Sequence, residues 1–229
     1  GYGYQFWRCR HNAYRGDGAF GQYCIVMPDQ EAVLAINSGL GDMQVPMTLV
    51  WEHLLPAMKD KPLPADAEAA QALTRKLDSL CLRTVEGARK SPLAGEYSGR
   101  VFKLGRNPDR IKTLRFDFSA NDVILTLSRA QGEQRIACGY GEWLRSAAGV
   151  PPIDRSLRFG DGRDFKPWQI AASGAWTDER TFVAKLWWYE TPLAATLTCH
   201  FDGDQVTVEQ RGNYGFYPTE GPTLNGTLS

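Results

Sequence analysis

Along residues 92–229, apolar and polar side chains alternate with the period-two spacing that is typical of half-buried strands. Asp202-Gly203-Asp204 lies between two such runs and predicts a hairpin turn. About eight to ten strands fit in this stretch with no long helix between them, so the spacing predicts an antiparallel barrel or sandwich. The expected strands include residues 93–104, 112–118, 123–127, 133–140, 155–160, 169–176, 182–188, 193–201 and 206–208.

The first 59 residues carry a different pattern. Residues 1–10 alternate like one strand, residues 11–18 form a polar loop, and residues 19–28 and 31–39 are strands that are apolar on both faces. Asp42 can then cap a helix over residues 43–58, which carries an apolar stripe at i, i+4, i+7 and i+8. Strands that are apolar on both faces normally lie between two layers. One helix covers one face only, so we expect the other face to need a further cover.

Between these blocks, the proline-bearing, charged residues 59–64 predict a linker. A helix over residues 64–82 follows, with Ala69, Leu73, Leu77 and Leu80 on one stripe. The predicted fold class is therefore α+β. Its parts are a three-stranded antiparallel sheet segment with a helix (1–59), a helical linker (60–91) and a mainly antiparallel β-barrel (92–229).

Composition narrows the function classes. Lys and Arg balance Asp and Glu at 26 each, which argues against nucleic acid as a partner. No apolar run approaches 18 residues, so we expect no membrane span. The five cysteines are scattered without a Cys-x-x-Cys pair, and the three histidines are not clustered. We therefore expect reduced thiols in a cytoplasmic protein, no metal site and no cofactor.

Three features of the first block occur together in one hydrolase family. They are an aromatic, glycine-rich opening (Gly1–Trp7), a later Ala19-Phe-Gly-Gln-Tyr23 segment with the Pro28-Asp29 turn, and a final strand and amphipathic helix. In this order they resemble the C-terminal end of serine β-lactamase and penicillin-binding-protein-like hydrolases, particularly the class C and esterase branch. The chain contains neither the Ser-x-x-Lys nor the Tyr-x-Asn motif of that family.

The resemblance implies that the chain is the C-terminal part of an acyl hydrolase. The parent would hydrolyse an ester, amide or β-lactam through an acyl-enzyme, and the nucleophile would lie before residue 1. The chain begins without an initiator Met in a strand pattern, so its partner would be the preceding part of the catalytic domain. Alone it would be inactive. Arg15, Asp17, Gly18 and Ala19 would then form a substrate wall, with the backbone N–H near Ala19 as an oxyanion donor.

The second block starts with Gly95-Glu-Tyr97-x-Gly99 and carries the Asp-Gly-Asp hairpin near its end. Together with the strand count, these features resemble the lipocalin-like barrel that some of these hydrolases carry. Trp187 and Trp188 are adjacent in a strand and so face opposite ways. With Trp176 they are candidate ligand contacts.

Two alternatives to the hydrolase interpretation stay open. One is a barrel that binds a small hydrophobic molecule, with the first block as a dimerisation element. The other is a purely structural accessory domain. In either case, the apolar sheet of residues 1–38 predicts a homodimer that covers its exposed face.

Overall fold

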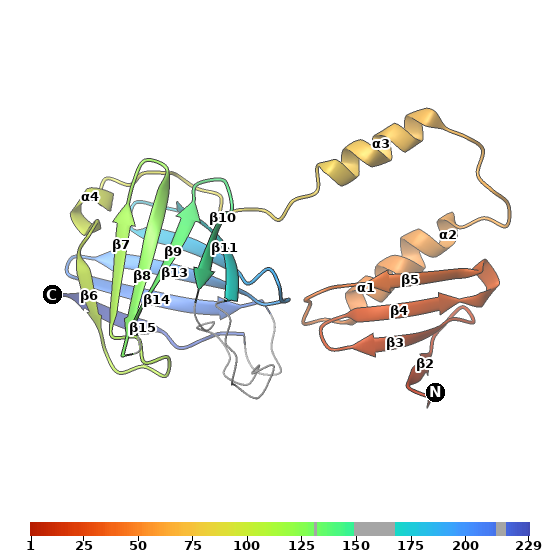
Figure 1. Cartoon of the computed structure of the whole chain (residues 1–229), viewed down its shortest axis with the longest axis horizontal. Helices are drawn as coiled ribbons and strands as arrows, with labels where there is room; N and C mark the ends of the chain where they lie inside the picture. Colours follow the sequence, from red (N-terminus) through yellow and green to blue (C-terminus); the bar gives the residue numbers. More distant parts are fainter. Residues whose placement is uncertain (131, 149–167, 214–218) are drawn as a thin grey trace. The chain divides into compact units, whose positions relative to one another are not determined.

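The computed structural model describes residues 1–130, 132–148, 168–213 and 219–229 (Figure 1). The chain forms two compact units, Gly1–Arg83 and Thr84–Ser229. Each unit has a hydrophobic core of its own.

The first unit is built on a five-stranded antiparallel sheet in which every strand pairs with the next along the chain. Its strands are β1 (Tyr2–Gly3), β2 (Phe6–Arg8), β3 (Tyr14–Gly18), β4 (Gln22–Met27) and β5 (Ala32–Ile36). The predicted strands over residues 19–28 and 31–39 correspond to β4 and β5 and are confirmed.

Two predictions for the start of the chain are wrong. Residues 1–10 form a tight hairpin rather than one strand, because Tyr4 and Gln5 take positive φ angles of 52° and 67° and reverse the chain. The polar residues 11–18, predicted as a loop, contain strand β3. Tyr14 pairs with Val26, and Asp17 pairs with Tyr23. Pairing with an apolar neighbour strand therefore outweighs the turn-like composition of Gly16-Asp17-Gly18.

The predicted helix over residues 43–58 is confirmed. It runs continuously through α1 (Gln44–Leu49), a π-helical turn (Val50–Leu54) and α2 (Leu55–Ala57). Pro56 has no N–H to donate to the carbonyl four residues earlier, and the helix widens at that turn. The Asp42 carboxylate accepts a hydrogen bond from the backbone N–H of Gln44 at 2.9 Å.

The helix covers one face of this sheet (Figure 1). The core between them consists of Ala13, Tyr23, Ile25, Met27, Met47, Val50 and Trp51. On the opposite face Val33 is 67% exposed and Cys24 is also exposed. The expected second covering layer is thus not present within this unit, as far as the structure describes it. The homodimer across this face stays a prediction.

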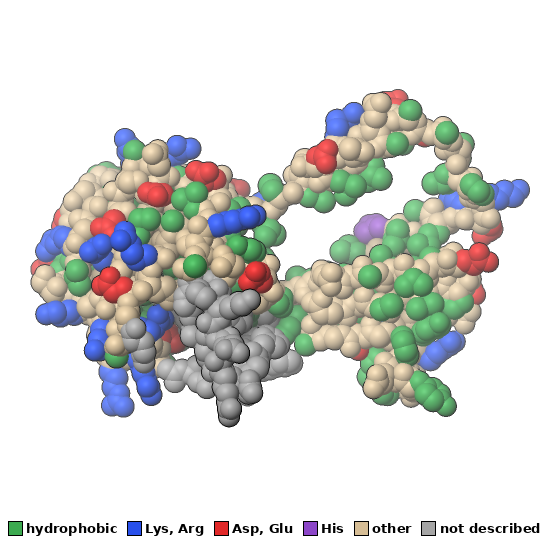
Figure 2. All heavy atoms as spheres, in the orientation of Figure 1, with side chains coloured by type: hydrophobic (Ala, Val, Ile, Leu, Met, Phe, Trp, Pro, Cys, Tyr) green, Lys and Arg blue, Asp and Glu red, His purple; other side chains and the backbone are tan. Residues whose placement is uncertain are grey.

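Helix α3 (Ala67–Asp78) lies within the predicted range 64–82. The Asp66 carboxylate caps it by accepting a hydrogen bond from the Ala69 N–H at 2.8 Å. None of its residues is buried, and Leu73 and Leu77 on the predicted stripe are more than half exposed. Figure 2 shows hydrophobic side chains along one side of this helix.

The second unit is the predicted β-barrel. Its strands pair in the order β10-β11-β12-β13-β14-β15-β6-β7-β8-β9, so the last strand of the chain pairs with β6, the first strand of this unit. The sheet closes where Ser173 of β11 pairs with Gly139 of β9. The strands are β6 (Val101–Leu104), β7 (Thr113–Phe118), β8 (Asp122–Arg129), β9 (Gly132–Gly139), β10 (Leu144–Ala148), β11 (Trp168–Trp176), β12 (Thr181–Trp187), β13 (Ala194–Asp202), β14 (Gln205–Gly212) and β15 (Leu224–Leu228).

The predicted strand over residues 93–104 is only partly correct. Its first half forms the short helix α4 (Ala94–Tyr97), and only Val101–Leu104 is strand β6. Gly99, at a φ of 77°, lets the chain turn between the two. The side chain of Tyr97 is buried in the barrel core, which holds the short helix in place. The strand predicted over residues 155–160 lies outside the described residues.

The segment before α4 crosses the outside of the barrel. The backbone N–H of Val85 donates to the Ser173 hydroxyl at 3.4 Å, and Ala88 exchanges two backbone hydrogen bonds with Trp176. The described chain is thus mostly antiparallel β-structure with few helices. The barrel prediction is confirmed, and the α+β class fits in part.

Candidate functional site

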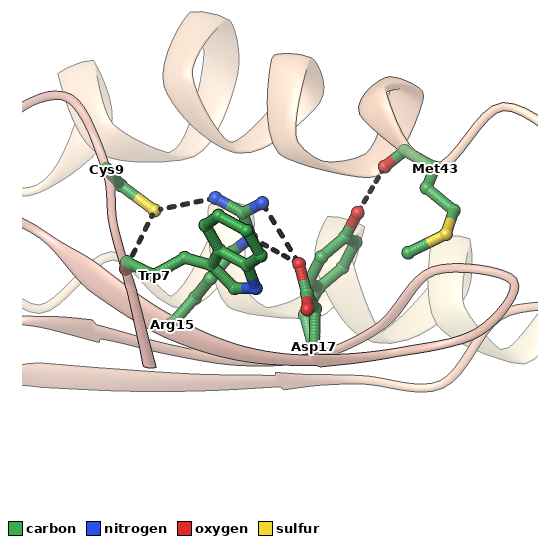
Figure 3. A network of polar contacts seen from close by, with 6 residues as sticks. Trp7, Cys9, Arg15, Asp17 and Met43 are labelled. Carbon is green, nitrogen blue, oxygen red and sulfur yellow. Dashed lines mark hydrogen bonds and ion pairs between the residues drawn. The ribbon is translucent and has the colours of Figure 1, made fainter. Parts of the chain in front are cut away.

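The sequence-predicted site residues in the first unit lie on and just after strand β3. Arg15 and Asp17 project from the same face and form an ion pair at 3.0 Å. The Arg15 guanidinium also donates to the Cys9 sulfur at 3.2 Å (Figure 3). Its charge is therefore engaged within the unit. Gly18 ends the strand, paired with Gln22, and both Gly18 and Ala19 are exposed.

The same network reaches the covering helix through Tyr23. The Tyr23 hydroxyl donates to the Met43 carbonyl at 2.5 Å (Figure 3), and the Arg15 guanidinium lies 5.8 Å from the centre of the Tyr23 ring. Burial raises the pKa of Tyr23, which keeps the hydroxyl a donor. These contacts tie the sheet to its helix, and the substrate-wall role of Arg15, Asp17, Gly18 and Ala19 stays a prediction.

The three candidate tryptophans of the barrel take different positions. Trp176, at the end of β11, and Trp188, just after β12, occupy inward-facing positions of the alternating pattern. Each side chain is 1% exposed. Trp187 faces outward and packs edge-on against Trp143, with ring centroids 6.4 Å apart. The predicted opposite orientation of Trp187 and Trp188 is confirmed, and only Trp176 and Trp188 are placed to contact something inside the barrel.

One end of the barrel is filled by aromatic rings, which we call the aromatic end. Phe201 stacks on Tyr97 at a centroid distance of 4.7 Å and meets Phe116 edge-on at 5.2 Å. The cluster consists of Tyr97, Phe102, Phe116, Phe118, Trp176, Phe182 and Phe201. Such interlocked rings close this end with side chains.

The inward side chains toward the opposite end, which we call the polar end, include small and polar residues together with the buried Leu186 and Trp188. Alanines occupy inward positions on three neighbouring strands, β11, β12 and β13: Ala172, Ala184 and Ala195. Arg129, Gln134 and Gln210 take inward positions at the same end, on β8, β9 and β14. The sequence carries one signal for this polar end. Val206, Val208 and Gln210 occupy alternate, inward positions of one strand, and the glutamine is a polar residue in an otherwise apolar row.

A chain of hydrogen bonds joins these polar groups. Arg129 donates through Nη1 to Gln134 Oε1 at 3.2 Å and through Nε to the Asp109 carbonyl at 3.2 Å. Gln210 Nε2 donates to Asp109 Oδ2 at 3.4 Å and to the Pro222 carbonyl at 3.2 Å. Burial lowers the pKa of Arg129, and the nearby Asp109 carboxylate opposes that effect.

Two atoms of this network lack a hydrogen-bond partner although they are buried. They are Gln134 Nε2 and Gln210 Oε1, on side chains that are 8% and 4% exposed. A buried polar atom without a partner costs about 1–3 kcal/mol. Trp188 Nε1 at the same end is a further buried donor without a hydrogen-bond partner.

The cysteines divide into accessible and buried groups, and their reactivity should follow. We expect a thiol reagent such as 5,5′-dithiobis(2-nitrobenzoate) at pH 8 to modify the exposed Cys24 and Cys81 in the native protein. Cys138 and Cys199 should react only after unfolding, because both are buried and burial raises the pKa of Cys138 to about 12. Mass spectrometry of tryptic peptides identifies the modified residues. Rapid native labelling of Cys138 would contradict this assignment.

No protein-family model matches the sequence, and no curated protein matches it. A solved structure that matches is the fatty-acid-binding protein in brain tissue of Drosophila melanogaster, without citrate inside. The TM-score is 0.38 and the sequence identity 10%, over 58% of this chain and 99% of that chain. The barrel assignment accordingly rests on the strand pairing described above. The β-lactamase resemblance stays a prediction from the sequence.

Two further properties bear on the kind of site. Among the described residues, no three His, Cys, Asp or Glu side chains are grouped so that they could hold a metal ion. In the same part of the chain, every helix is too short or too polar to cross a bilayer.

Proposed function

We propose that the barrel of the second unit binds a small molecule inside its polar end. The observation that supports this most directly is the pair of unpartnered buried atoms, Gln134 Nε2 and Gln210 Oε1. A ligand that hydrogen-bonds to them would recover free energy that the unliganded barrel forgoes.

The sizes of the inward side chains also favour the polar end as the place where a ligand binds. The aromatic cluster occupies the opposite end, whereas inward alanines on β11, β12 and β13 lie here together with the buried Trp188. Barrels of this size hold either side chains alone or one small ligand. A ligand with an apolar body would lie against these alanines, and its polar group would meet the two glutamines.

The proposal is tested with 1-aminoanthracene, a neutral apolar fluorophore, titrated against the whole chain. We expect saturable enhancement of its emission at micromolar concentration. Ala195→Phe should weaken binding at least tenfold, because Ala195 faces inward near the Gly212 end of β14. The matched control is Ala194→Phe, which places the same ring on the outward face of the adjacent position.

A purely structural barrel would give no saturable signal, and that result would overturn the proposal. Equal affinity of Ala195→Phe and the parent would also overturn it. Circular dichroism checks that each variant is folded. If Ala195→Phe does not fold, Ala195→Leu adds less volume at the same position and should still weaken binding relative to Ala194→Leu.

A further inference from the structure

We infer that helix α3 docks reversibly on the uncovered face of the sheet in its own unit. Both surfaces are apolar, and both belong to the compact unit Gly1–Arg83. The inference concerns this unit alone, so it does not depend on the function proposed for the barrel.

The residues of β3, β4 and β5 that point away from the covering helix (residues 44–57) form a continuous apolar surface, which we call the open face. They are Tyr14, Gly16, Cys24, Val26, Val33 and Ala35, which pair directly across the three strands. Phe6 of β2 extends this surface, because its ring meets the Tyr14 ring edge-on at 5.7 Å. None of these residues is charged. Exposed apolar patches of this kind mark sites of contact with another element.

Helix α3 carries an apolar stripe that needs a partner. Ala70, Leu73 and Leu77 recur at the i, i+3 and i+7 positions of one side, whereas Arg75 and Asp78 fall on the opposite side. None of its 12 residues is buried. A helix of this length is marginal in water when it packs against nothing. Contact between the stripe and the open face would therefore stabilise the helix and cover the sheet together.

The linker is long enough for this contact. Nine residues separate Ala57, the end of α2, from Ala67, the start of α3. Fully extended, such a segment spans about 30 Å. Layers on opposite faces of one sheet are about 20 Å apart, since each lies about 10 Å from the sheet. Helix α3 is about 18 Å long, close to the roughly 20 Å of the six-residue strand β4.

The short linker also favours contact within one chain over pairing of two copies. It holds α3 near the open face at an effective concentration in the millimolar range. In a solution of about 10 µM protein, a second copy competes at a concentration about a hundredfold lower or less. We therefore expect α3, rather than a second copy, to occupy the open face.

Hydrogen exchange of the whole chain, followed by mass spectrometry, tests the docking. Peptides from α3 should exchange at least tenfold more slowly in the parent than in the double variant Leu73→Lys/Leu77→Lys. Lysine has nearly the helix propensity of leucine, so the variant removes the apolar contact and keeps the helix-forming tendency. The matched control is Gln71→Lys/Ala72→Lys, which adds the same two lysines away from the stripe and should leave α3 protected.

Two further measurements examine the other partner, the open face. Ala35→Lys places a charge on the exposed middle of β5 and should remove the protection of α3 although it lies on a different element. Cys24 lies beside Ala35 on the open face. Its thiol should react with 5,5′-dithiobis(2-nitrobenzoate) in the parent whenever α3 leaves, and at least fivefold faster in the double leucine variant.

Several results would overturn the inference. Exchange of α3 that is equally fast in the parent and in the double leucine variant would show that the helix is not docked. An equal loss of protection in the control would show that the helix merely frays. If Ala35→Lys leaves α3 protected, the stripe packs elsewhere. Finally, light scattering over a tenfold range of concentration should show a monomer with constant α3 protection, whereas protection that rises together with a dimer would identify a second copy as the partner.

Discussion

Replacing Ile25 by alanine is expected to unfold the sheet and helix of residues 1–58 while the barrel stays folded. Ile25 is fully buried on β4, in the core between the sheet and the helix. Truncating a buried isoleucine to alanine costs about 2–5 kcal/mol. A unit of this size has a total stability of about 3–9 kcal/mol, so the loss takes a large share of it or all of it.

Hydrogen exchange followed by mass spectrometry measures this effect separately in the two units. In the variant, peptides from β3 to β5 should exchange much faster, and peptides from β6 to β15 should keep the protection that they have in the parent. The matched control is Val33→Ala on neighbouring β5, where the side chain is 67% exposed. It should cost less than about 0.5 kcal/mol. Faster exchange throughout the barrel as well would contradict the prediction that the hydrophobic cores of the two units are independent.

Replacing Phe201 by alanine should produce the largest loss of barrel stability. The Phe201 ring is fully buried and lies at the centre of the aromatic end, in contact with Tyr97 and Phe116. Phe→Ala in a core costs about 3–5 kcal/mol, because the transfer free energy is lost and a cavity remains. For a unit of this length, that corresponds to a fall in melting temperature of roughly 6–20 °C.

Near-ultraviolet circular dichroism during heating follows this transition, because it reports on fixed aromatic rings. His200→Ala is the matched control on the adjacent position of β13, where the side chain is exposed. It should change the barrel melting temperature by no more than about 2 °C. An equal effect of the two variants would show that the aromatic end does not hold the barrel together.

Periodicity carried most of the fold prediction. The alternating rows that contain Phe116, Phe182 and Phe201 predict strands with one inward face, and each of these rings is fully buried. The stripe of the helix at residues 43–58 likewise predicts its packing against the sheet. Both signals are local, because the spacing of apolar residues directly reflects the repeat of the backbone conformation.

The errors came where local composition and long-range pairing disagree. Gly16-Asp17-Gly18 has the composition of a turn, yet β4 supplies the hydrogen-bond partners that make it a strand. Residues 94–97 continue an apolar pattern, yet the burial of Tyr97 against Phe201 and the turn at Gly99 give a short helix. A single window of sequence does not contain these partners.

The candidate site in the barrel also depends on partners that are distant in the sequence. Sequence reasoning named Trp176, Trp187 and Trp188 as candidate ligand contacts without deciding which of them face inward, and it did not select Gln134 or Gln210. The two glutamines lie 76 positions apart in the chain and are joined only through Arg129 and Asp109. Which of their atoms is left without a partner depends on contacts that only the closed barrel creates.

The sequence by itself therefore determined the alternation of the strands and the stripe of the helix, because both follow from the repeat of the local backbone conformation. The tertiary structure alone decided three other features. These are the closure of the barrel, the aromatic filling of one end and the unpartnered donor and acceptor at the other. Each of them depends on residues distant in the chain meeting in one interior, where burial makes an unsatisfied hydrogen bond costly.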